Sequence, residues 1–110
     1  MGKFIDVMQV EELEEILRQG GKKLFFKHSA TCPISARAHQ EVEQWLAEQG
    51  PEQVVYRIVV QAARPVSNRL AEVSGVAHAS PQVLWLDGTS PLWHTSHGQI
   101  TRANLQAHIN

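Results

Sequence analysis

The chain has 110 residues, of which 43% are hydrophobic and 19% charged. This length and apolar fraction suffice for one domain with a buried core, spanning residues 1–110, and argue against wholesale disorder. Ten basic and eleven acidic side chains leave a formal net charge of -1, which gives no support to a nucleic-acid or membrane partner. No apolar run approaches the roughly 20 residues of a membrane helix, and no secretory signal opens the chain, so we expect a cytoplasmic protein.

The first part of the chain alternates predicted strands and helices. Residues 3–7 suit a short strand, and the apolar residues of 9–19 recur at helical spacing until Gly20 and Gly21 end that helix. Residues 22–28 (KKLFFKH) predict a second strand.

A second helix is predicted to begin at Cys32-Pro33, because proline at the first helical position sacrifices no hydrogen bond. Gly50-Pro51 ends it. Residues 54–60 (VVYRIVV) are nearly all apolar and mostly β-branched, which predicts a central strand covered on both faces.

The last third predicts a helix, a hairpin and a final helix. Asp87-Gly88 favours a tight turn between antiparallel strands. The segments are a helix opened by Pro65 and closed by Gly75, strands over 83–86 and 92–96, and a helix capped by Thr101.

The predicted element order is therefore β-α-β-α-β-α-β-β-α. Helices between the first strands require crossovers and favour parallel pairing, whereas the hairpin makes the last pair antiparallel. We therefore expect an α/β fold with a central mixed sheet and helices on both faces. This is the thioredoxin architecture, with Cys32 at the junction between the second strand and its helix.

Cys32 is the only cysteine, which excludes an internal disulfide and a cysteine-rich zinc site. A helix N-terminus offers unpaired N–H groups and partial positive charge, so this position predicts a thiol pKa below about 8.5. The N–H groups of Ile34 and Ser35 can point at the sulfur, and the Ser35 hydroxyl can donate to it. The opposing interpretation, an inert core thiol, conflicts with the loop-type residues Thr31 and Pro33 that flank it.

Several charged or titratable residues near Cys32 in the sequence are weaker indicators of function than the cysteine itself. His28, Lys27 and Arg37 are close to Cys32 in sequence and can add electrostatic support. We expect His28 to be a strand-end residue rather than a general base, and His39 to be a solvated side chain of the cysteine helix.

Two further features of the sequence concern metal binding and the backbone beside Cys32. His94 and His97 come closest to a metal-ligand pair, but on a strand side chains three apart point to opposite faces, so no metal site is expected. Pro81 precedes a strand, where a trans bond is the local preference; the fold favours a cis Ser80-Pro81 bond beside the cysteine helix.

Three segments, FKHSATCPIS (26–35), VVYRIVV (54–60) and ASPQVLWLDG (79–88), resemble the monothiol bacilliredoxins, which are thioredoxin-like redox proteins of the bacillithiol system. The resemblance extends over essentially the whole chain. Ser35 stands where thioredoxins carry the second cysteine of their CxxC pair. The CGFS signature of monothiol glutaredoxins is absent.

The resemblance implies an oxidoreductase that removes bacillithiol from mixed disulfides on client proteins and takes part in the oxidative-stress response. Cys32 would attack the bacillithiol sulfur, become S-bacillithiolated and need a separate reductant. It further implies bacillithiol as thiol co-substrate with no bound cofactor. The implied site residues are Pro33, Ile34 and Ser35 in the active-site turn, Thr31, Ser80 and Pro81 along the substrate groove, and His28 as electrostatic support.

Two other functions remain open from the sequence. One is a thioredoxin-like protein-binding module in which Cys32 is incidental, so that Cys32→Ser would retain partner binding. The other is an iron–sulfur carrier that bridges two copies through Cys32 and external thiols, which would colour after anaerobic reconstitution.

Overall fold

The computed structural model describes residues 1–109. A five-stranded sheet with the strand order β1-β3-β2-β4-β5 forms its centre. The elements are β1 (Lys3–Asp6), α1 (Val10–Arg18), β2 (Lys22–His28), α2 (Pro33–Ala47), β3 (Val54–Val59), α3 (Arg64–Ser74), β4 (Gln82–Asp87), β5 (Ser90–Ser96), a 3₁₀ turn η1 (His97–Gln99) and α4 (Arg102–His108).

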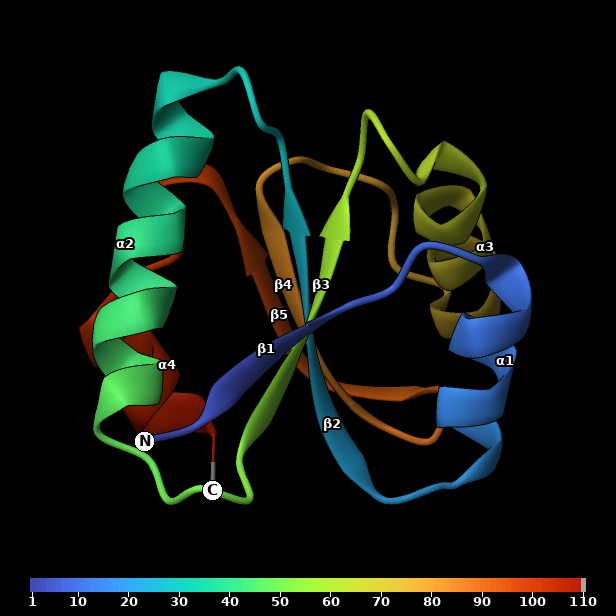
Figure 1. The fold of residues 1–110 in the computed structure, drawn as a ribbon, viewed down its shortest axis with the longest axis horizontal. Helices are drawn as coiled ribbons and strands as arrows, with labels where there is room; N and C mark the ends of the chain where they lie inside the picture. The colour runs from blue at the N-terminus through green and yellow to red at the C-terminus, as the bar shows by residue number, and fades with distance from the viewer. Residues whose placement is uncertain (110) are drawn as a thin grey trace.

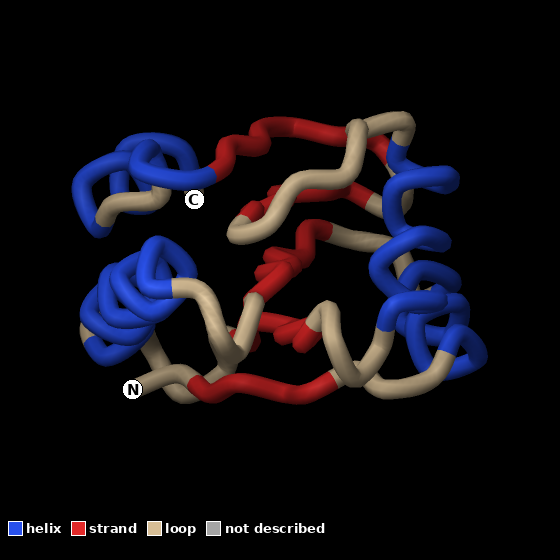
Figure 2. Tube along the Cα trace, turned by 90° about the horizontal axis from the view of Figure 1, so that it is seen from above, coloured by secondary structure: helices blue, strands red, loops and turns tan. Residues whose placement is uncertain are grey.

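The sheet is mixed, as the sequence predicted. Strand β3 pairs in parallel with both β1 and β2, whereas β4 is antiparallel to β2 and to β5. Helices α2 and α4 cover one face and α1 and α3 cover the other, so that the sheet lies between two helical layers (Figures 1 and 2). The predicted element order and the two-faced covering are therefore confirmed.

Residues 54–60 are predicted to form a central strand covered on both faces, and β3 is indeed an internal strand with one buried residue in the apolar cluster of each face. The centre of the sheet is β2, whose residues 24–27 are all buried. In β3 only Val55 and Ile58 are buried. The difference arises because β3 has the four-residue edge strand β1 as its outer neighbour, which leaves part of it open to solvent.

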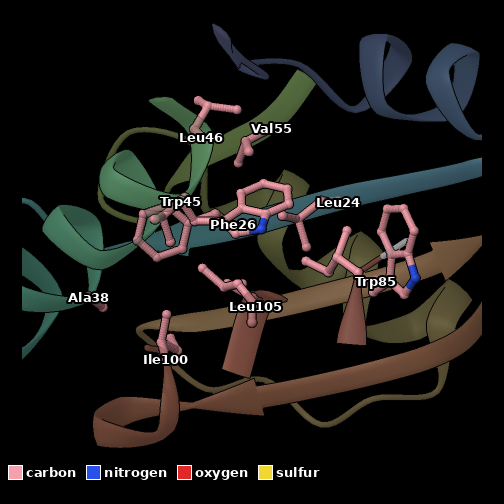
Figure 3. Packing of buried hydrophobic residues seen from close by; sticks show 12 residues of the cluster. Leu24, Phe26, Ala38, Trp45, Leu46, Val55, Trp85, Ile100 and Leu105 are labelled. Carbon is pink, nitrogen blue, oxygen red and sulfur yellow. The ribbon is translucent and has the colours of Figure 1, made fainter. Parts of the chain in front are cut away.

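Two apolar clusters hold β2 in place, one on each face. Figure 3 shows the cluster beneath α2 and α4, where Phe26 of β2 meets Trp45 of α2 and Leu105 of α4. On the other face Phe25 packs against residues of α1 and α3. Because the side chains of a strand alternate between its faces, the run from Leu24 to Phe26 anchors both layers. Strand β2 is therefore packed against helices on both faces of the sheet.

The residues that the sequence predicts to end or cap a helix do so in the structure. Gly20 and Gly21 follow α1 with φ values of 67° and 80°, a region that favours glycine. The Thr101 hydroxyl accepts the N–H of Asn104 at 3.1 Å and caps α4. None of the helices within residues 1–109 has the length and apolar character needed to cross a bilayer.

Candidate active site

Cys32 lies where the sequence placed it, between β2 and α2. It is the N-cap residue of α2, with extended backbone angles, and Pro33 opens the helix. The thiol is free and half-buried. Within residues 1–109 the sulfur makes no capping hydrogen bond, so the expected contacts with the N–H groups of Ile34 and Ser35 are not formed in this arrangement. Those N–H groups belong to the first turn of α2, where a helix has no internal acceptor for them.

Ser35 is fully buried, and its hydroxyl is engaged away from the sulfur. Its Oγ accepts the N–H of Ser29 at 2.8 Å and lies 2.8 Å from Nδ1 of His28. A hydroxyl carries a single proton, so the Ser35 oxygen either donates to His28 Nδ1 or accepts from it. The Ser35 hydroxyl therefore also joins the end of β2 to the first turn of α2, a role that the sequence did not suggest.

His28 is a strand-end residue, as expected. Burial lowers the pKa of His28, and the nearby His39 and Arg57 lower it further. The neutral form of the ring is therefore favoured, and electrostatic support of Cys32 by His28 stays a prediction. The tautomer of His28 determines whether the Ser35 hydroxyl donates to Nδ1 or accepts from it.

His39 is not the solvated side chain that the sequence predicted, since only 19% of it is exposed. It stacks on Phe4 with the ring centres 5.0 Å apart, and Arg57 lies 2.9 Å from its Nε2. Because the guanidinium can only donate, Nε2 accepts, and Nδ1 donates to Glu43 at 2.9 Å. The reason is tertiary: this face of α2 packs on β1 and β3, and the His39 ring lies 4.8 Å from that of His28.

Arg57 and Asp6 complete this polar network. Arg57 donates to both carboxylate oxygens of Asp6, at 2.7 and 3.0 Å, and this contact lowers the pKa of Asp6. Sequence reasoning missed both residues. The available signal was the single charge of Arg57 inside an otherwise apolar run, which indicates a partner for it.

Gln61, also missed by sequence reasoning, holds the loop before Cys32. Its amide nitrogen donates to Ser29 Oγ at 2.7 Å and to Thr31 Oγ1 at 3.2 Å, and its amide oxygen accepts the N–H of Ala30 at 3.1 Å. Thr31 itself is exposed. The loop is thus positioned from the end of β3 as well as by the chain on either side of it.

Ser80 and Pro81 lie at the same end of the sheet as Cys32. The pairing of Lys27 with Gln82 places Pro81 next to the end of β2, where His28 is located. The Ser80-Pro81 bond is cis, as the fold led us to expect. Ser80 Oγ is buried and has no hydrogen-bond partner within residues 1–109.

Lys27 does not assist Cys32, because it points to the opposite face of β2 from α2. It is fully buried, and its Nζ lies 3.2 Å from Nδ1 of His78, which in turn lies 3.1 Å from Oγ of Ser67 in α3. Burial lowers the pKa of Lys27 to about 8. No cluster of histidine, cysteine and acidic residues suited to a metal ion occurs in residues 1–109.

Solved structures identify the class of this fold. One, described as having a thioredoxin fold, superposes with a TM-score of 0.87 at 28% identity, over 97% of this chain and 94% of that one. The reduced thioredoxin pre-protein of Schistosoma mansoni gives 0.73 at 13% identity, over 97% and 95%. Fasciola hepatica thioredoxin gives 0.73 at 15% identity, over 94% of each chain. The chain is therefore a thioredoxin-fold protein.

The family follows from the sequence itself. The family model described as Monothiol bacilliredoxin BrxC matches residues 5–105, which include Cys32 and every other candidate site residue. The chain belongs to the monothiol bacilliredoxin family. Membership of this family, together with the fold, supports a thiol redox role.

Proposed function

We propose that this protein removes bacillithiol from mixed disulfides on client proteins in the cytoplasm, with Cys32 as the nucleophile. The observation that carries the proposal is the half-exposed, unpaired thiol at the N-cap of α2, with a serine one turn further on. A helix N-terminus stabilises negative charge, and the thiolate is the reactive form of cysteine.

The proposed reaction is a thiol–disulfide exchange. The Cys32 thiolate attacks the bacillithiol sulfur of the mixed disulfide, a new sulfur–sulfur bond forms, and the client thiolate leaves and takes up a proton. Cys32 is then S-bacillithiolated. A second thiol, supplied by a separate reductant, attacks this adduct and releases Cys32. Ser35 cannot expel the bound thiol through an internal disulfide, so the cycle needs that external reductant.

The chain's own residues have distinct roles in this scheme. Pro33 and Ile34 shape the turn after the nucleophile, and Thr31, Ser80 and Pro81 line the groove that receives the client. The Ser35 hydroxyl joins His28 and Ser29 at the end of β2 to the first turn of α2, and so positions the start of the helix that carries Cys32.

The test uses a purified client protein carrying bacillithiol on one cysteine. Wild-type protein should release the client thiol and gain the mass of one bacillithiol on Cys32, whereas Cys32→Ser should leave the client at its background exchange rate. Exposed Ser90→Ala serves as a matched control and should behave as wild type. Undiminished release by Cys32→Ser would refute the redox proposal, and client binding without release by the wild type would favour the binding-module interpretation.

A further inference from the structure

A pocket beside the first turns of α2 is not used by the reaction as proposed. Its volume is about 420 Å³, within the range of small-molecule sites. One wall is formed by α2, with Ile34, Arg37 and Glu41, and the other by the β5–α4 connection, with His97 and Gly98. In Figure 1 this connection runs close to α2, and the two segments are in contact.

Each wall of the pocket carries a residue that is a neighbour of the candidate active site. Ile34 follows Cys32 by two positions and is 52% exposed. On the other wall, His97 donates its backbone N–H to the carbonyl oxygen of Pro81 at 3.0 Å. His97 adopts a φ of 55°, in the left-handed region that few residues other than glycine occupy. The pocket therefore begins two residues after Cys32, which is not itself among the residues that line it.

Glu41 and Arg37, which line the pocket, differ in their hydrogen bonds and ion pairs. Glu41 accepts the backbone N–H of Arg102 at 2.9 Å, which fixes its carboxylate at the start of α4. Arg37 has no hydrogen-bond or ion-pair partner within residues 1–109. Its backbone lies about 7.5 Å along the helix axis from Cys32, within the reach of a long side chain and a small thiol.

We propose that this pocket binds the carboxylate-bearing part of the small thiol that is transferred to Cys32, with Arg37 as the specificity-determining residue. Guanidinium groups suit carboxylates because both are planar and can form two parallel hydrogen bonds. The inference rests on the proposed function, since it assumes that a small thiol is bonded to the Cys32 sulfur.

The test uses pyridyl disulfides of two thiols, mercaptosuccinate with its two carboxylates and uncharged thioglycerol. The Cys32 thiolate attacks the sulfur of the small thiol, the original sulfur–sulfur bond breaks, and pyridinethiolate leaves as coloured thiopyridone. The rate of this step is read from absorbance. Each variant is compared with wild type on the same probe, so that the intrinsic reactivities of the probes cancel.

Arg37→Gln should react about fivefold more slowly than wild type with the mercaptosuccinate probe and within about twofold of wild type with the thioglycerol probe. Arg37→Lys, which retains the charge but not the two parallel donors of a guanidinium, should recover only part of the loss. Arg18→Gln removes an exposed guanidinium at the far end of α1 and should match wild type with both probes. A general effect on Cys32 would slow both probes alike.

The outcomes separate this inference from the proposed function. If wild type reacts with the thioglycerol probe and Arg37→Gln changes both rates by the same factor, the pocket does not recognise carboxylates and the inference fails, while the redox function stands. If wild type reacts with neither probe at a rate above that of Cys32→Ser, the proposed function fails first.

Discussion

Replacing buried Lys27 with methionine tests how much the buried ammonium group destabilises the folded protein. Lys27 is fully buried, and burial lowers its pKa from 10.5 to about 8. Between these two values the unfolded chain holds more protons than the folded protein, so the wild-type free energy of unfolding should rise with pH through this window. Below about pH 8 Lys27 is charged in the folded protein, so burial of the charge lowers the free energy of unfolding by its full amount.

The expected change in the free energy of unfolding follows from the difference between the two pKa values of Lys27. One pKa unit corresponds to about 1.4 kcal/mol, so a fully buried charge would lose about 3 kcal/mol. Because the exposed His78 ring lies against Nζ and lets solvent screen the charge, we expect about 2 kcal/mol. Lys27→Met has a similar shape, and His78 keeps Ser67 as a hydrogen-bond partner. The variant should therefore be more stable than wild type near neutral pH.

Urea unfolding of both proteins between about pH 7 and pH 10 measures this effect. The stability advantage of Lys27→Met should shrink by about 2 kcal/mol across the range, because only the wild type loses a buried charge. Lys22→Met, which changes an exposed lysine of the same strand, should run parallel to wild type. A Lys27→Met advantage that stays constant with pH would show that the Lys27 charge is not excluded from water in the folded protein.

Two other substitutions probe the contacts around the candidate site. Ser35→Ala leaves a backbone N–H and the His28 ring without their partner and should lower the free energy of unfolding by about 2 kcal/mol in thermal or urea melts, whereas Ser90→Ala should change little; an unchanged stability would mean that water replaces the hydroxyl. Asp6→Asn should cost less than about 1 kcal/mol, because half-exposed ion pairs contribute little. Since contact with Arg57 lowers the Asp6 pKa, that stability should be present above the ordinary carboxyl pKa and disappear in acid melts as pH falls through the folded-state pKa; a deficit that persists at low pH would contradict this.

Several features of this protein are determined by neighbouring residues and were predictable from the sequence. Pro33 begins α2, Gly20 and Gly21 end α1, and Thr101 caps α4, because each of these effects acts within one helical turn. Their spacing predicted the element order and the position of Cys32 at a helix N-terminus. The alternation of strands and helices then restricted the fold to a mixed sheet covered on both faces.

Other features depend on which strands become neighbours, and only the tertiary structure decided them. Arg57 finds Asp6 because β3 pairs with β1, a contact between residues far apart in the chain. The same packing removes His39 from solvent, and the pairing of β2 with β4 brings Pro81 next to the end of β2. Local sequence contains little information on such pairings, because their free energy comes from surfaces buried together only after the sheet has formed.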